Sequence, residues 1–397
     1  METNFRKFIQ CYKTTAVMLM NICLLFALVN ILGFAGIDIR ENYFKQKTDV
    51  AEKYSDVDLT KVYPKFSSGE IAEIQKENQE RPSLYEPFTQ FKERPYSGKY
   101  VNVSEAGFRF SKDQESWPLK PENFNVFVFG GSTTFNYGLP DDQTIASYLQ
   151  EYLSALKKEK VAVYNFGRSG YFSTQERILF EQLLVAGHRP DMAIFIDGLN
   201  EFYFYQGQPK YTEYFEELQQ FVDKPSQAFK FAFASVAEKL PITRLAHFLG
   251  KLFAKNQASG GKTEYNDPVV ASRVINNYLE NKKIIEASAK AYQANPIFVW
   301  QPVPNYQYDL QYYLFSANGE TDFDAHNYAK YGYSQMAEIW RQEKLGNNFF
   351  WCADMQEGIK EPLYVDKVHY TAAMSKNFAE LIGGLLVERG FLYDSSN

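Results

Sequence analysis

A serine, a histidine and an aspartate have the types and surroundings that nucleophilic catalysis needs. Ser132 follows an apolar run and two glycines in the stretch FVFGGSTT, residues 127–134. A serine hydroxyl acts as a nucleophile when a base takes its proton and an acid orients that base. His369 lies three residues after Asp366. On a loop, this spacing brings the carboxylate to Nδ1 of the imidazole and leaves Nε2 free for a serine hydroxyl.

Other interpretations of Ser132 and of the base stay open on these residues alone. A phosphate-binding loop needs a Lys-Ser/Thr pair after its glycines, and no lysine follows here. The sequence does not match the Gly-x-Ser-x-Gly motif of the nucleophile elbow in α/β-hydrolases, because Thr134 occupies the position of the second glycine. Gly-Gly-Ser taken alone is most simply a turn. Among the 4 histidines, His326 is a weaker competitor for the base, with Asp322 and Asp324 nearby.

Short apolar runs that alternate with helical stretches would position these residues. Strands are predicted at 124–129, 161–164, 192–196, 296–300 and 348–352, and a closing helix at 371–388. This alternation predicts a flavodoxin-like three-layer α/β/α fold with a five-stranded parallel sheet. Because sites in such sheets form at the carboxyl ends of strands, the loops that follow the strands should carry the chemistry. These loops are 130–133, 165–170, 197–200 and 301–304. Ser173 and Glu176 are expected to form a capping box at the start of a helix.

The N-terminal region is predicted to anchor the chain in a membrane. Residues 14–36 carry no charge and are long enough to cross a bilayer as a helix. Arg6, Lys7 and Lys13 precede this run, so the N-terminus is expected in the cytoplasm and the rest of the chain outside. We expect a single-pass, uncleaved anchor, and a cleaved signal peptide is the alternative.

The chain divides into three predicted parts. Residues 1–36 form the cytoplasmic N-terminus and anchor, and residues 37–121 form a stalk or lead-in segment with a short strand at 100–103. Residues 122–397 form the alternating domain, and a helical insertion occupies 206–294.

Composition excludes some classes of function. The net charge is −6 and no basic run is present, which argues against nucleic-acid binding. The three cysteines, Cys11, Cys23 and Cys352, form no metal motif, and no structural disulfide, metal or organic cofactor is expected. Aromatic residues make up 17% of the chain, and aromatic faces suit sugar rings as well as protein cores.

Four blocks of sequence resemble the SGNH (GDSL-type) hydrolase family when taken together in this order. They are Phe129-Gly-Gly-Ser132, Tyr164-Asn-Phe-Gly-Arg-Ser-Gly170, Asp197-Gly-Leu-Asn200 and Asp366-Lys-Val-His369. The resemblance implies that Ser132 is the nucleophile, His369 the base and Asp366 its partner. It also implies an oxyanion hole made by the N–H groups of Ser132 and Gly170 and the side-chain amide of Asn200. Gly167 is the second choice for Gly170, and Gly131 replaces the family's aspartate.

The expected function is a serine esterase that hydrolyses an O-acyl ester through an acyl-Ser132 intermediate. The acyl group is expected to be acetyl and its carrier an extracytoplasmic carbohydrate. An O-acyltransferase of an extracellular polysaccharide could use the same triad. In another class, a non-catalytic carbohydrate-binding module could retain the fold without the reaction. The expected partners are the ester substrate and, through the N-terminal helix, the membrane.

Overall fold

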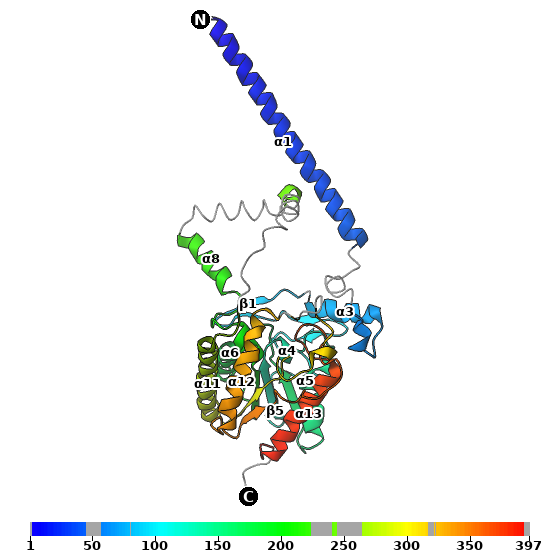
Figure 1. The fold of residues 1–397 in the computed structure, drawn as a ribbon, viewed down its shortest axis with the longest axis vertical. Helices are drawn as coiled ribbons and strands as arrows, with labels where there is room; N and C mark the ends of the chain where they lie inside the picture. The colour runs from blue at the N-terminus through cyan, green and yellow to red at the C-terminus, as the bar shows by residue number, and fades with distance from the viewer. Residues whose placement is uncertain are drawn as a thin grey trace. The chain divides into compact units, whose positions relative to one another are not determined.

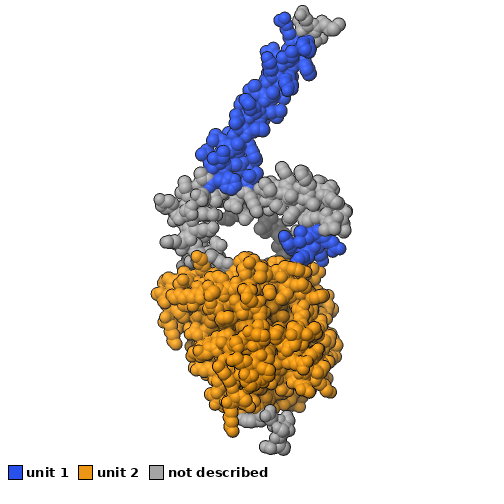
Figure 2. Space-filling model, turned by 180° about the vertical axis from the view of Figure 1, so that it is seen from behind, with its two compact units in different colours: residues 1–49, 213–263 blue, residues 50–212, 264–397 orange. Residues whose placement is uncertain are grey.

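The computed structural model describes residues 2–44, 57–79, 81–223, 240–243, 264–316, 321 and 323–392. The chain forms two compact units, residues 1–49 with 213–263 and residues 50–212 with 264–397 (Figure 2). All of the predicted site residues lie in the second unit. The predicted lead-in segment and insertion fall partly on 45–56, 80, 224–239 and 244–263, which lie outside the described residues.

The first unit begins with one long helix. Helix α1 (Glu2–Phe44) continues beyond the predicted end at residue 36. Within its segment Phe5–Phe34, an 18-residue stretch reaches a mean hydropathy of 2.4, and the helix is long and apolar enough to cross a membrane. Helix α8 (Thr212–Asp223) starts the second stretch of this unit.

The second unit is built around a parallel sheet of five strands in the order β6-β5-β7-β8-β9. Helices α11 and α12 lie on one side of the sheet and α5 and α13 on the other (Figure 1). The strands are β5 (Phe124–Gly130), β6 (Val161–Asn165), β7 (Met192–Asp197), β8 (Asn295–Trp300) and β9 (Phe349–Trp351). This confirms the predicted sheet and its three-layer fold. The chain leaves β5 toward β6 on one side and returns to β7 on the other. This reversal makes the carboxyl end of β5 the point where a site is expected.

Helices cover both faces of the sheet because the strands are apolar on both faces. Val126 and Val128 of β5 pack with α5 and α13, while Phe127 and Phe129 pack on the opposite face with α6, α11 and α12. The helices are α5 (Ile145–Ser154), α6 (Ser173–Val185), α11 (Pro268–Ala291), α12 (Asn327–Arg341) and α13 (Ala372–Glu388). Helix α11, at the end of the predicted insertion, therefore belongs to the layer that covers the sheet.

Shorter elements surround the carboxyl edge of the sheet. The lead-in segment forms η1 (Leu59–Lys61), α3 (Ser68–Gln79), the hairpin β1 (Leu84–Glu86)–β2 (Gln90–Lys92) and the pair β3 (Tyr96–Ser97)–β4 (Asn102–Val103). The strand predicted at 100–103 is confirmed as β4. The loops after the sheet strands contain α4 (Ser132–Phe135), η2 (Asp141–Gln143), α7 (Leu199–Tyr203), η3 (Leu310–Tyr312) and η4 (Asp324–His326).

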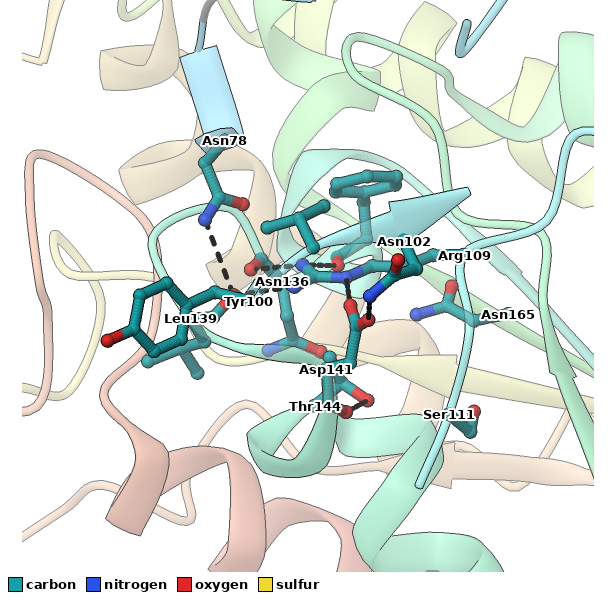
Figure 3. Close-up of polar contacts among 12 residues, drawn as sticks. Asn78, Tyr100, Asn102, Arg109, Ser111, Asn136, Leu139, Asp141, Thr144 and Asn165 are labelled. Carbon is teal, nitrogen blue, oxygen red and sulfur yellow. Dashed lines mark hydrogen bonds and ion pairs between the residues drawn. The ribbon is translucent and has the colours of Figure 1, made fainter. Parts of the chain in front are cut away.

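A buried arginine from the lead-in segment holds the chain that follows Ser132. Arg109 is 0% exposed. Its guanidinium donates to the carbonyl oxygens of Phe135 at 2.7 Å, Asn136 at 2.8 Å and Leu139 at 2.5 Å, and to the Asp141 carboxylate at 2.9 Å (Figure 3). A planar guanidinium satisfies several carbonyls that would otherwise be buried without donors. The lead-in segment is thus part of the structure that positions the end of α4.

The Arg109→Met variant should lose stability, because it leaves buried carbonyls and a largely buried Asp141 carboxylate without their donor. The expected loss in the free energy of unfolding is about 3–5 kcal/mol. Urea unfolding of the full chain measures it. Arg341→Met, which removes an exposed ion pair with Glu338, is the control and should cost less than about 1 kcal/mol. Equal losses in the two variants would contradict the role given to Arg109.

Candidate active site

Ser132 stands at the first position of a short helix directly after the central strand. The chain turns at Gly130, whose φ is 155°, and a Cβ there would lie 2.0 Å from Thr134 Oγ1. Only glycine fits such a turn without displacing the helix. Ser132 is partly exposed, and its N–H donates no backbone hydrogen bond within the described residues. This free donor is expected at the first turn of a helix.

His369 and Asp366 form the pair that the sequence predicts. The Asp366 carboxylate oxygens lie 2.7 and 2.8 Å from His369 Nδ1. Asp366 Oδ1 also accepts the backbone N–H groups of Val368 at 3.0 Å and His369 at 2.9 Å. Burial would raise the pKa of Asp366, but the His369 charge and these hydrogen bonds hold it below its usual value. Nε2 of His369 is buried and has no hydrogen-bond partner within the described residues.

Two contacts join the segment of Ser132 to the loop of His369. The N–H of Tyr137 donates to the Ser132 carbonyl at 3.1 Å, and the Tyr137 ring packs beside the His369 imidazole with centroids 5.7 Å apart. The residues that follow Ser132 and His369, Thr133 and Tyr370, both donate hydroxyl hydrogen bonds to the Gln301 side chain. Because each link begins at or next to Ser132 and His369, the two loops belong to one site.

Asn200 lies against the residue that precedes Ser132. A Cβ built on Gly131 would stand 2.2 Å from Asn200 Nδ2 and 3.2 Å from the Tyr171 carbonyl oxygen. Asn200 Nδ2 donates to that carbonyl at 2.7 Å. An amide nitrogen carries two hydrogens, so one remains for another acceptor. This packing explains the glycine at position 131, since a side chain there would displace the held amide.

The structure distinguishes the two glycines of the loop after β6. The N–H of Gly167 donates to Asn165 Oδ1 at 3.0 Å, and a Cβ on Gly167 would lie 2.4 Å from the Phe135 nitrogen. Gly167 is therefore a packing residue against α4, with its donor already used. Gly170, at φ 77°, adjoins Tyr171, and its N–H makes no hydrogen bond within the described residues. These contacts favour Gly170 as the oxyanion donor.

The predicted capping box at Ser173 is wrong, although the helix itself is confirmed. Ser173 is the first residue of α6 and Phe172 is its N-cap, without a side-chain cap. Glu201 of α7 takes the place expected for Glu176: its carboxylate accepts the Ser173 N–H at 2.6 Å and the Ser173 hydroxyl at 3.2 Å. A spatial neighbour from another loop therefore caps α6. The contact ties the loop of Gly170 to the helix that carries Asn200.

Glu176 instead joins a buried cluster of three carboxyl groups with Asp197 and Glu201. Burial and the neighbouring carboxylates raise the pKa of Glu176 and Asp197 well above their usual values, and burial raises that of Glu201 to about 7. Both oxygens of Glu176 and Oδ2 of Asp197 are buried and meet no donor within the described residues, so two charged carboxylates are unfavourable here and the pair keeps a shared proton. No group of His, Cys, Asp and Glu suited to hold a metal ion is found in the part of the chain that the structure describes.

Within the described residues, which do not include Asp322, His326 is not paired with a carboxylate as His369 is. Its ring packs on Tyr203 with centroids 4.4 Å apart, and its Nδ1 has no partner within the described residues. Burial lowers the pKa of His326 to about 4. Asp324, which the sequence placed near it, forms an ion pair with Lys367 at 2.6 Å. His369 is therefore the histidine with the geometry of an oriented base.

Three residues near the site, Tyr137, Gln301 and Glu201, were not predicted from the sequence. Gln301 was within a loop expected at the carboxyl edge of the sheet, and Glu201 directly follows Asn200. These positions were signals that the residues lie near the site. Tyr137 offered no such signal, because its contact with His369 joins residues far apart in the chain.

No family model and no curated protein matches the chain. Solved structures that it resembles include a protein described as lipolytic, of the G-D-S-L family, from Desulfitobacterium hafniense (12% identity, TM-score 0.35, 66% of this chain and 100% of that one). The chain is also similar to a lipase, Lip_vut3, from a goat rumen metagenome (10% identity, TM-score 0.39, 66% of this chain and 97% of that one). Another similar structure is a catalytic variant of Axe2, an acetylxylan esterase from Geobacillus stearothermophilus (13% identity, TM-score 0.35, 69% of this chain and 97% of that one).

The carboxyl cluster predicts a pH-dependent effect of Glu176→Gln on stability. The pKa of each carboxyl is higher in the folded protein than in the unfolded chain, so the folded protein keeps protons that the unfolded chain releases as the pH rises. The free energy of unfolding of the wild type therefore falls as the pH rises through this range. The side-chain amide of the Glu176→Gln variant can still donate a hydrogen bond to Asp197, but unlike the carboxyl group it does not titrate between pH 5 and pH 8. The variant's thermal midpoint should therefore match that of the wild type near pH 5 and exceed it by at least about 2 °C at pH 8.

Calorimetry of both proteins from pH 5 to pH 8 measures this difference. Glu280→Gln, at an exposed ion pair with Lys283, should show no such pH-dependent gain. A Glu176→Gln difference that is the same at both pH values would contradict the shared proton.

Proposed function

We propose that this chain is a serine esterase in which Ser132, His369 and Asp366 form the catalytic triad. One observation carries the proposal: the partly buried Asp366 carboxylate orients His369 through Nδ1, Nε2 has no hydrogen-bond partner within the described residues, and the loop of His369 is joined to the segment of Ser132 through Tyr137. An imidazole that a carboxylate orients through Nδ1 can use Nε2 to take the proton of a serine hydroxyl that approaches it.

The reaction proceeds in two displacements. His369 Nε2 takes the Ser132 hydroxyl proton while Ser132 Oγ attacks the ester carbonyl, and the Asp366 carboxylate stabilises the imidazolium that forms. The C–O bond to the alcohol then breaks, and His369 returns the proton to the leaving oxygen. In the second displacement, His369 Nε2 takes a proton from water, and the resulting hydroxide attacks the carbonyl of the acyl-Ser132 ester. The bond to Ser132 Oγ then breaks, His369 returns the proton to Oγ, and the acid leaves.

Three donors would stabilise the oxyanion of each tetrahedral intermediate. The N–H groups of Ser132 and Gly170 make no hydrogen bond within the described residues, and Asn200 Nδ2 has one hydrogen beyond its bond to Tyr171. Neutral donors fixed by surrounding structure stabilise a developing charge without reorganising, and each is typically worth roughly 10²–10³ in rate. Asn200 is held by the Tyr171 carbonyl, and the loop of Gly170 is held through Ser173 by Glu201.

The proposed substrate is a short acyl ester, such as acetate, on a carbohydrate. Aromatic rings flank the proposed oxyanion donors: Phe204 lies within 3.4 Å of a Cβ built on Gly170 and stacks on Phe172, and Tyr203 is 40% exposed. Such rings offer flat apolar faces to a sugar. The reaction is proposed to take place outside the cytoplasm, with α1 as a single-pass anchor whose N-terminus is cytoplasmic, because Arg6, Lys7 and Lys13 precede the uncharged run at 14–36.

Ser132→Ala should lower kcat for p-nitrophenyl acetate by on the order of 10³ or more, because triad members act as a unit. His369→Ala should lower it to a similar residual rate, and the double variant should be no worse than either one. Steady-state kinetics on the purified full chain measure these values. Ser272→Ala, at an exposed serine on α11, is the control and should keep wild-type activity. Near-wild-type turnover by Ser132→Ala would refute the assignment.

The substrate class is tested with a series of esters. We expect kcat/KM to fall from acetyl to octanoyl esters and to rise when the acetyl group is on a xylo- or gluco-oligosaccharide. Released acid and acylated sugar are both quantified by mass spectrometry, with and without an added oligosaccharide acceptor. A preference for octanoyl esters would contradict the short-acyl substrate. An acyl-sugar yield above that of free acid would replace hydrolysis by acyl transfer.

A further inference from the structure

Gln301 is a buried polar residue at the carboxyl end of β8, a strand whose following loop supplies neither a triad member nor an oxyanion donor. Its side chain is 2% exposed. Its backbone is fixed on both sides: the N–H donates to the Asp197 carbonyl at 2.9 Å, and its carbonyl accepts the Tyr333 hydroxyl at 2.9 Å. The amide group therefore projects from a rigid position on the sheet.

One oxygen of this amide joins the nucleophile segment to the base loop. Gln301 Oε1 accepts the Thr133 hydroxyl at 2.7 Å and lies 2.9 Å from the Tyr370 hydroxyl, whose single hydrogen it shares with the Pro302 carbonyl oxygen. Thr133 follows Ser132 and Tyr370 follows His369, and all three linked side chains are buried. Two hydroxyls on one acceptor fix the distance between the chains that carry them. Neither the Asp366–His369 pair nor the oxyanion donors provide this connection.

An amide suits this position better than other polar groups. A carbonyl oxygen has two lone pairs and accepts two hydroxyl donors while staying neutral. A carboxylate could accept both, but an added buried negative charge near the Asp366–His369 pair would be costly and would change the charge balance of the base. The Tyr370 hydroxyl also lies 2.7 Å from the Pro302 carbonyl oxygen, so Tyr370 keeps an acceptor if Gln301 is replaced.

We infer that Gln301 is a positioning residue that sets the separation of Ser132 and His369 by holding Thr133 and Tyr370 on a single amide oxygen. This role rests on the proposed function. It acts through two neighbours and not through contact with the substrate. A misplacement of reacting groups by about 1 Å can cost roughly 10²-fold in rate.

Gln301→Met tests the role, because methionine has a similar length and no polar group. We expect kcat for p-nitrophenyl acetate to fall by about 10- to 100-fold while KM changes by less than about 3-fold. Gln356→Met is the matched control. Gln356 is also fully buried and bonds the Val303 and Tyr306 carbonyls and the Tyr364 hydroxyl, so its loss should lower the thermal midpoint without that fall in kcat.

A double-mutant cycle separates positioning from general destabilisation. Thr133→Val keeps the shape of the side chain and removes its hydroxyl. It should lower kcat alone, but it should add little in the Gln301→Met background, because the same link is already lost. Thr133→Val also gives a direct answer if Gln301→Met does not fold, since a wild-type kcat in that variant would overturn the role.

The outcomes distinguish this role from the proposed function. A wild-type protein without esterase activity overturns the proposed function, and this role with it. An active wild type with an equally active Gln301→Met variant overturns the role alone. Equal losses of kcat in Gln301→Met and Gln356→Met, or full additivity with Thr133→Val, also overturn it.

Discussion

The hydrogen bond between the Asp366 carboxylate and His369 Nδ1 is the interaction on which the proposed chemistry depends. It determines which ring nitrogen carries the proton and therefore which one can act as a base. The carboxylate is itself fixed by two backbone N–H groups of the same loop, and the Val365 N–H donates to the His369 carbonyl at 2.8 Å. The loop thus orients the imidazole before any substrate arrives, which is the preorganisation that general-base catalysis needs.

Buried polar residues fix the other loops at the carboxyl edge of the sheet in the same way. Arg109 donates hydrogen bonds to the carbonyls at the end of α4, and the Glu201 carboxylate accepts the first N–H of α6. Glu93 of the lead-in segment accepts the Ser169 N–H at 3.1 Å, in the loop that contains Gly170. Each of these side chains is largely buried. In the protein interior, a polar group without a hydrogen-bond partner lowers stability, whereas a fully hydrogen-bonded group is held rigidly. The loops that follow β5, β6 and β7 are therefore held by partners from distant parts of the chain.

The sheet and the Asp-His pair could be predicted from sequence because both depend on local patterns. Apolar runs such as 192–196 define strands by themselves, and the spacing of Asp366 and His369 closes within one loop. The Ser173 capping box failed for the opposite reason, since Glu201 competes for the same N–H from another loop. The roles of Arg109 and Gln301 likewise depend on residues far away in the sequence. The glycine at 131 became interpretable only when Asn200 was seen against it.

The most direct test of the central claim is the chemical identity of the nucleophile. The full chain is treated with a fluorophosphonate, digested, and mapped by mass spectrometry to find which residue carries the phosphonyl adduct. We predict one adduct, on Ser132, which forms in the wild type and is strongly slowed in Asp366→Asn, where the orientation of His369 is lost. An adduct on another serine, or a wild type that stays unlabelled while a known serine hydrolase reacts in the same tube, would contradict the account.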